Sequence, residues 1–389
     1  MLMRCVVSYV AVDRPAEEYL HLKTTSDKTC RLTWLVPHSA PLRLRRLLAK
    51  VYEFGGVHSG AAVCSVIWFF LFSGFLTRDL VSNHPAVREV VVLALDYALL
   101  LLLITLLITA YPRFRFSSHN TFERFHRWGG WGSLALFWVE LVVYASTLKT
   151  SRPLIVSLTK LPAFWFLLIS SFHCIYPWFR LHKLRVIPEK LSDHAIRLHF
   201  NEKMPLFVGL RISDSPLTEW HSFACIPARD GFGGSVLISD AGDWTRKTIH
   251  APRPYYWVKG VPVTGVLCMA RIFRRVVVVT TGSGIGPCLA VIQDVPQSGT
   301  ECRVIWSTPD PLATYGWEIC EAVHAVDKHA VIIDTRKEGR PDLVKRAWDL
   351  YHETTAEAVF VISNPKLTRK VVYGLESRGV PAFGPIWDS

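Results

Sequence analysis

The chain has 389 residues, half of them hydrophobic, and carries a formal net charge of +12 at pH 7. This length predicts about two to three domains. A basic chain can bind nucleic acid, or it can be a membrane protein with basic cytosolic loops. None of its nine cysteines forms a C-x-x-C pair, and the odd count argues against a disulfide framework.

Four long apolar runs occupy the first half of the chain, at residues 54–77, 90–112, 128–148 and 161–179. Their only acidic residues are Asp96 and Glu140. Runs of this length can cross about 30 Å of hydrocarbon as helices. We therefore expect a cytosolic N-terminal segment over residues 1–53 and a four-helix transmembrane domain over residues 54–180.

The basic residues indicate the orientation of these expected spans. They are concentrated in residues 43–50, 113–127 and 180–185, which all lie on one side of the predicted bundle. Cytosolic loops carry such an excess of lysine and arginine, so both termini are expected in the cytosol. We therefore expect the partner of the chain to be the lipid bilayer of the plasma membrane or the endoplasmic reticulum. The basic cytosolic loops account for the positive net charge, and no nucleic-acid partner is expected.

Three histidines lie near the cytosolic ends of the expected spans: His58, His126 and His173. Imidazoles on facing helices can ligate a haem iron or line a quinone pocket, and interfacial histidines can also simply bond to headgroups or carbonyls. Asp96 and Glu140 allow a proton path, a ligand site or a bond to a neighbouring helix. These alternatives stay open at this point.

The second half of the chain has the amino-acid composition of a soluble protein. Short apolar segments at residues 195–200, 206–212, 236–238 and 256–258 predict a β-barrel over residues 184–270. Buried-type strands at 276–279, 302–306, 330–333 and 358–362 predict an α/β domain over residues 271–389.

A glycine-rich turn joins the first of these strands to a helix. Glycines there let the backbone approach a pyrophosphate, whose charge meets the helix N-terminus. The candidate NAD(P)H-binding residues are Thr281, Gly282, Ser283, Gly284, Gly286 and Pro287.

Two further motifs carry a family resemblance: E-W-H-S-F-A-C-I-P at residues 219–227 and G-D-W-T at residues 242–245. They resemble the H-P-F-T and G-D-W-T segments of the ferric reductase and NADPH oxidase branch of the ferredoxin-NADP reductase superfamily. The resemblance implies an FAD site and a nicotinamide-nucleotide contact in the G-R-P segment at 339–341. The implied residues are His221, Ser222, Phe223 and Ala224 near the flavin ring, Gly242, Asp243, Trp244 and Thr245 near its pyrophosphate, and Arg340 near the nucleotide.

The whole layout is similar to fungal TmpA-type integral membrane proteins, but several positions depart from the superfamily pattern. Ala224 replaces a hydroxyl residue, and Ser239 stands where an arginine would pair with flavin phosphates. Ser363 and Asn364 stand where the family has a Cys-Gly pair. Each change removes an orienting group, on which hydride transfer depends.

These patterns predict a membrane flavoprotein oxidoreductase that passes electrons from NAD(P)H through FAD to a lipophilic or metal acceptor, with haem as one acceptor. The alternative is a regulatory membrane protein that binds flavin or nucleotide without efficient turnover, since fold does not establish function. A transporter is a third interpretation, although the sequence has no visible inverted repeat.

Overall fold

The structure is a computed structural model that describes residues 36–50, 56–82, 86–148, 153–204, 206–228, 232–260 and 263–385. The chain forms two compact units. One comprises residues Gly56–Pro177, and the other comprises Met1–Gly55 together with Trp178–Ser389. Residues 1–35, most of the predicted N-terminal segment, lie outside the described part.

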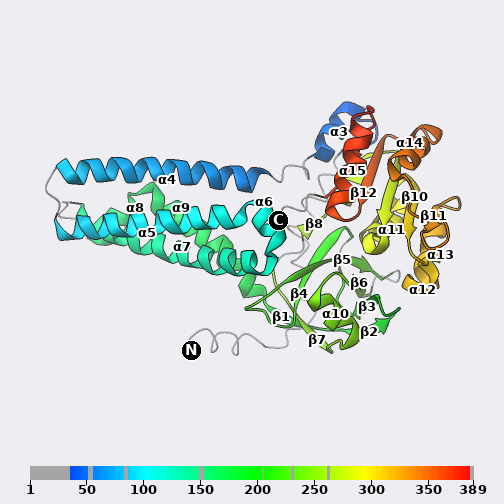
Figure 1. The fold of residues 1–389 in the computed structure, drawn as a ribbon, viewed down its shortest axis with the longest axis horizontal. Helices are drawn as coiled ribbons and strands as arrows, with labels where there is room; N and C mark the ends of the chain where they lie inside the picture. The colour runs from blue at the N-terminus through cyan, green and yellow to red at the C-terminus, as the bar shows by residue number, and fades with distance from the viewer. Residues whose placement is uncertain are drawn as a thin grey trace. The chain divides into compact units, whose positions relative to one another are not determined.

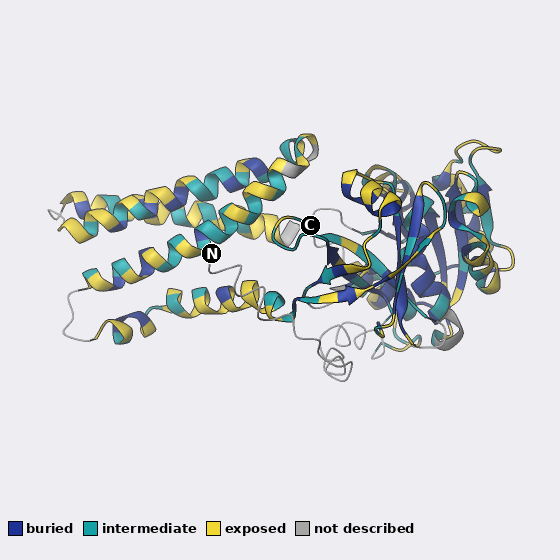
Figure 2. Ribbon diagram, turned by 90° about the horizontal axis from the view of Figure 1, so that it is seen from below, coloured by how far each residue is buried: buried dark blue, intermediate teal, exposed yellow. Residues whose placement is uncertain are grey.

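The first unit is all helical. Its helices are α4 (Gly56–Ser82), α5 (Val87–Ala110), α6 (Pro112–Ser117), α7 (His119–Thr147), α8 (Leu154–Thr159) and α9 (Pro162–Ile175). Helix α5 packs against both α4 and α7 (Figure 1). Many residues of this unit are exposed (Figure 2). They include large apolar side chains such as Trp68, Phe75 and Leu101.

The expectation of four spans is wrong for the described residues. Two helices are long and apolar enough to cross a membrane, His58–Ser82 and Val87–Ala110. Helix α7 has 29 residues, but glycine, serine and charged residues dilute its aliphatic content. Lys160 follows α8 and Pro162 begins α9, which leaves α9 only 14 residues long. Such a helix is about 21 Å long, shorter than the hydrocarbon layer.

The second unit begins with a nearly closed antiparallel barrel. Its strands are β1 (His182–Arg185), β2 (Ile187–Lys190), β3 (Ala195–Phe200), β4 (Val208–Ser213), β5 (His221–Pro227), β6 (Gly234–Ser239), β7 (Tyr255–Val258) and β8 (Val263–Thr264), ordered β1-β7-β4-β5-β6-β3-β2 with β8 on β4. Helix α10 (Asp243–His250) follows β6. Alternate residues of β3 and β4 point into the core, as in a strand with one buried face.

The α/β domain follows the short 3-10 helix η4 (Val266–Ile272). Its parallel strands β9 (Arg275–Thr281), β10 (Glu301–Thr308), β11 (Val331–Asp334), β12 (Ala358–Ile362) and β13 (Ala382–Phe383) are ordered β11-β10-β9-β12-β13. The helices are α11 (Ile285–Ser298), α12 (Pro311–Tyr315), α13 (Trp317–Val326), α14 (Leu343–Glu353) and α15 (Pro365–Glu376). The chain order reverses between β9 and β12, which is the topological switch point where open α/β sheets bind ligands.

A helix from the N-terminal segment, α3 (Leu42–Ala49), packs on η4 in this second unit. Arg45, 4% exposed, donates from Nη1 and Nη2 to the carboxylate of Glu357, at 2.7 and 3.0 Å. Arg45 also donates to the Ile272 carbonyl at 2.9 Å. No periodic signal in the sequence indicated this attachment, because the two partners are separated by 312 residues.

Candidate nucleotide site

The glycine-rich turn lies at the switch point of the parallel sheet. Strand β9 ends at Thr281, and Gly282 follows with φ +53°, in the left-handed region that glycine adopts without strain. A Cβ on Gly284 would lie 2.6 Å from the Ile362 carbonyl oxygen of β12, so only glycine allows this approach. Helix α11 then starts at Ile285 and directs its N-terminus toward the end of the sheet.

Three hydrogen bonds hold this turn from different sides. The Ser239 hydroxyl at the end of β6 donates to the Ser283 hydroxyl at 2.7 Å. The Trp306 indole of β10 donates to the Gly282 carbonyl at 3.0 Å, and the hydroxyls of Thr281 and Ser363 hydrogen-bond to each other. The turn is therefore preformed, and one of its three anchors comes from the barrel.

The remaining residues of the predicted turn have structural roles in this arrangement. A Cβ on Gly286 would lie 3.3 Å from the side chain of Leu237 on β6, so this glycine permits close packing of helix and barrel. Pro287 occupies the third position of α11, where a missing N–H breaks no intrahelical bond. Helix α11 begins directly after the turn, and a helix N-terminus favours a negatively charged group.

Arg340 lies in the segment between β11 and α14, after Gly339 at φ +76°. Its side chain is exposed. Strand β11 stands two positions from β9 in the sheet, about 10 Å at the usual strand spacing. Within the described residues no hydrogen bond or ion pair joins Arg340 to the glycine turn, and the two predicted elements are separated by strand β10.

The residues of the first flavin motif form part of an aromatic stack in the barrel wall. The ring of His221 stacks on Trp244 with centroids 4.1 Å apart, and Phe223 stacks on the same indole at 5.9 Å. Trp244 is 8% exposed and belongs to the barrel core, with Tyr256 against its edge. Of the other motif residues, Ser222 is exposed and Ala224 is half-buried. Trp244 thus covers one face of the His221 ring, so a ligand could stack only on the other face.

The indole of Trp244 is anchored by a carboxylate that the sequence did not signal. Asp214 accepts from Trp244 Nε1 at 3.1 Å, from Lys247 Nζ at 3.1 Å and from Arg253 at 3.2 Å. Burial disfavours the charged form of Asp214, but the hydrogen bonds of Lys247 and Trp244 and the charges of Lys247 and Arg253 outweigh it and hold the pKa of this carboxyl below its usual value.

Thr245 is the residue expected to meet the flavin pyrophosphate, but its hydroxyl is engaged locally. It accepts from the backbone N–H groups of Ala241 and Gly242, both at 2.9 Å, and donates to the Gly242 carbonyl at 2.8 Å. Asp243, in the first turn of α10, is fully exposed and places a negative charge at the same point. The Thr245 hydroxyl is therefore not free to bond to a flavin phosphate, and Asp243 would repel a phosphate at this position.

The three candidate haem histidines belong to the helical unit. His58 is exposed, and the Nδ1 of His173 hydrogen-bonds to the Ile169 carbonyl of its own helix at 2.8 Å. His126 packs against Phe122, and its Nδ1 is buried without a partner among the described residues. No cluster of three or more potential metal ligands is found in the described part of the chain.

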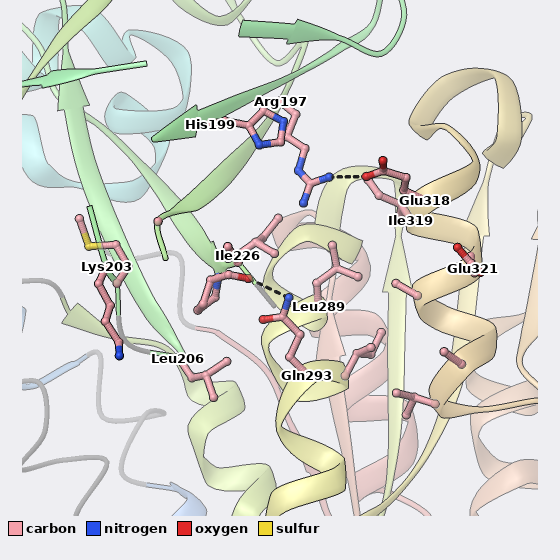
Figure 3. Close-up of a pocket in the computed structure, with 18 residues that line it drawn as sticks. Arg197, His199, Lys203, Leu206, Ile226, Leu289, Gln293, Glu318, Ile319 and Glu321 are labelled. Carbon is pink, nitrogen blue, oxygen red and sulfur yellow. Dashed lines mark hydrogen bonds and ion pairs between the residues drawn. The ribbon is translucent and has the colours of Figure 1, made fainter. Parts of the chain in front are cut away.

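A groove of about 1070 Å³ lies between the barrel and helices α11 and α13 of the α/β domain (Figure 3). Leu206 and Ile226 line its barrel side, and Leu289 and Ile319 line its helical side. Two contacts cross it, from Gln293 to the Pro227 carbonyl at 2.9 Å and from Arg197 to Glu318 at 3.1 Å (Figure 3). None of the predicted cofactor residues lines this groove, so it is distinct from the site at the glycine turn.

The fold and the site define a two-domain unit, an antiparallel barrel followed by a doubly wound α/β domain with a glycine-rich turn at its switch point. Residues 266–389 match the family described as "Adenylate-forming reductase 03009, C-terminal domain". Over 359 residues the chain is 46% identical to adenylate-forming reductase 03009 of Coprinopsis cinerea, and over 362 residues it is 45% identical to adenylate-forming reductase 06235 of the same fungus. Each alignment covers 91% of this chain and 34% of the relative, so the chain spans about a third of the length of these relatives.

Solved structures similar to the chain include a ferredoxin NADP+ reductase from Neisseria gonorrhoeae with bound FAD and NADP. It has a TM-score of 0.44 and 13% identity, and covers 53% of this chain and 99% of its own. CYP116B46 from Tepidiphilus thermophilus also has a TM-score of 0.44, with 14% identity over 53% of this chain and 29% of its own. The similarity to TmpA-type membrane proteins is not among these findings and stays a prediction.

Proposed function

We propose that this chain is a reductase module that binds a nicotinamide nucleotide at the turn Gly282–Gly284. The observation that carries the proposal is the position of this turn at the switch point between β9 and β12, directly bonded to the barrel through Ser239 and Ser283. A phosphate placed there meets the N-terminus of the 14-residue helix α11. The reductase names of the two Coprinopsis cinerea relatives support the same class of activity.

In this proposal the residues of the chain bind and orient the nucleotide. The N–H groups at the start of α11 hold the phosphates. Gly282 has no side chain, so the phosphates can approach the backbone closely. Arg340, exposed at the same edge of the sheet, provides a cation for the adenosine side of the nucleotide. The hydroxyls of Thr281 and Ser363 hydrogen-bond to each other between β9 and β12 and form the surface on which the nicotinamide lies.

The acceptor of the hydride is the second part of the proposal. The resemblance to the ferredoxin-NADP reductase superfamily implies FAD on the barrel, where it would supply two-electron to one-electron conversion. The partly exposed residues Ser222 and Phe223 of β5 are compatible with a flavin ring. The Thr245 hydroxyl is not available for the pyrophosphate, because it is already bonded to the backbone of Gly242. Backbone contacts alone would have to hold the phosphates.

We further propose that the helical unit lies in a membrane and that the second unit is cytosolic. The helical unit exposes large apolar side chains and buries Asp96 and Glu140, the reverse of a water-soluble bundle. A lipophilic or metal electron acceptor, haem included, would then bind near His58, His126 and His173.

A second candidate function is nucleotide binding without efficient turnover. Ala224 offers no hydroxyl near a flavin ring, and the hydroxyl of Ser363 is already bonded to Thr281. A protein with these features can hold a nucleotide and report its presence without fast hydride transfer.

Anaerobic absorption spectroscopy of the purified full chain, before and after adding NADH or NADPH, tests these candidates. A flavin band that bleaches establishes the reductase, and comparing the donors gives the nucleotide preference. A flavin band that persists favours the non-catalytic candidate. Absence of a flavin band together with absence of nucleotide binding by calorimetry contradicts both. A reduced-minus-oxidised difference spectrum reveals or excludes a b-type haem in the same sample.

A further inference from the structure

The helical unit buries two carboxyl groups that the nucleotide site does not use. Asp96 on α5 is 0% exposed and Glu140 on α7 is 8% exposed, whereas Phe75 and Leu101 of the same unit are 68% and 67% exposed. Acidic side chains are almost never fully buried unless they are paired. Their burial here therefore needs a partner.

The fold brings these carboxyls together from different helices. Helix α5 packs against both α7 and α4, and this packing places Asp96 on α5 close to Glu140 on α7 and to Ser73 on α4. Ser73 lies nine residues before the end of α4, and Asp96 lies nine residues after the start of α5. Both positions are about 14 Å from those helix ends, close to the middle of a hydrocarbon layer of about 30 Å.

The hydrogen bonding at this point is incomplete when both carboxyls are ionised. Neither oxygen of Asp96 has a hydrogen-bond partner among the described residues. The Ser73 hydroxyl donates to the Phe69 carbonyl at 2.9 Å, so it is not the donor that Asp96 lacks. An ionised carboxylate can only accept, whereas a protonated one also donates. A proton between Asp96 and Glu140 would supply the missing donor.

Compensating cations are distant from the pair. On α7 the preceding charged residue is Arg127, 13 residues from Glu140, or about 20 Å along the helix. Helix α8 has no charged residue, and the ionisable groups of α9 are His173 and Cys174, both in its last turn. The other charged residues and histidines of the packed helices lie toward their ends: His58, Arg78, Asp79, Arg88, Glu89, Arg113, Arg115, His119, Glu123, Arg124 and His126. The remaining titratable residues are Cys64 on α4, Tyr97 on α5 and Tyr144 on α7.

We propose that Asp96 and Glu140 form a proton-binding site inside the helical unit, in which the two carboxyl groups share one proton. Two adjacent carboxyls in an apolar setting cannot both ionise, because each charge disfavours the other. The shared proton supplies the hydrogen-bond donor that two ionised carboxyls lack, and raising the pH removes it. This site is independent of the nucleotide site and of whether the chain is a reductase.

The test is infrared spectroscopy of the full chain in lipid nanodiscs as the pH is raised. We expect a protonated-carboxyl C=O band at neutral pH that is lost in alkali and absent from the double variant Asp96→Asn/Glu140→Gln. Glu123→Gln, on the same helix as Glu140 but half-exposed and near the helix end, is the matched control and should leave the band unchanged. A band that persists in the double variant overturns the proposal.

Labelling with dicyclohexylcarbodiimide keeps the test informative if the variants do not fold. A protonated carboxyl adds across one C=N bond of this apolar reagent and rearranges to a stable N-acylurea, without any other reactant. At neutral pH we expect the unmodified chain to be labelled at Asp96 or Glu140 at least about tenfold more than at Glu123, since one pKa unit changes the protonated fraction about tenfold. Equal labelling of Asp96, Glu140 and Glu123 overturns the proton site. Labelling of Asp96 or Glu140 that is blocked by sodium or calcium ions but not by alkali also overturns it.

Discussion

The hydroxyl of Ser239 donates to the hydroxyl of Ser283 at 2.7 Å and so joins the last residue of barrel strand β6 to the glycine turn of the α/β domain. In the superfamily that the motifs resemble, an arginine is expected at the position of Ser239. Here a short side chain reaches the turn itself. The two domains therefore meet at the place where a nucleotide is proposed to bind.

Ser283→Asp should weaken nucleotide binding. A carboxylate at the N-terminus of α11 would occupy the anion position and repel the phosphates, so we expect the Kd for NADH or NADPH to rise at least about tenfold, equivalent to about 1.4 kcal/mol. Isothermal titration calorimetry measures this effect. Thr218→Asp adds the same charge at an exposed barrel residue and should leave Kd unchanged. Equal Kd values in both variants and the parent would remove the turn from the proposed site.

His221→Ala should lower the amount of flavin that purifies with the chain, if the barrel binds FAD as the motif resemblance implies. The structural loss is one stacking contact with Trp244, about 0.5–1.5 kcal/mol, so the variant should fold. Flavin content per chain and the melting temperature are the two measurements. His250→Ala, exposed on α10, is the control. Undiminished flavin in the His221 variant would place any flavin elsewhere.

Arg45→Ala should destabilise the second unit strongly. It leaves the carboxylate of Glu357, whose side chain is 16% exposed, without its guanidinium, and breaking such a buried pair costs about 3 kcal/mol. Lys50→Ala removes an exposed ion pair with Glu376 and should cost below about 1 kcal/mol. Thermal unfolding compares the two variants. Adding Glu357→Gln to Arg45→Ala should recover part of the loss, and no difference between Arg45→Ala and Lys50→Ala would contradict the assigned role.

Acid should destabilise the barrel through Asp214. Its pKa is held below the ordinary value in the folded state, so its contribution to stability is present above the unfolded pKa of about 3.9 and is lost as the pH falls through the lower folded pKa. The melting temperature should therefore fall steeply below about pH 4. Asp214→Asn should be less stable at neutral pH and lose less on acidification. Asp349→Asn, at an exposed pair, should keep the slope of the parent.

Local patterns were sufficient for the secondary structure that positions the site. Strand β3 was predicted at residues 195–200 and is observed as Ala195–Phe200, because alternating burial can be read directly from its sequence. The turn at Gly282 was predicted because a strand, glycines and a helix follow one another within a few residues. The four apolar segments were recognised as helical, but the proline at position 162 and the composition of α7 reduced the candidate spans to two.

Contacts between distant segments could not be predicted in this way. Trp244 and Thr245 were read as flavin contacts, yet the tertiary structure turns the indole into the barrel core and closes the hydroxyl onto Gly242. The pairing of Asp96 with Glu140 and of Arg45 with Glu357 also depends on how helices and strands pack. The sequence alone determined the order and type of elements, since periodicity is a local property. Only the tertiary structure decided which polar groups meet, because their partners are chosen by burial and close packing across hundreds of residues.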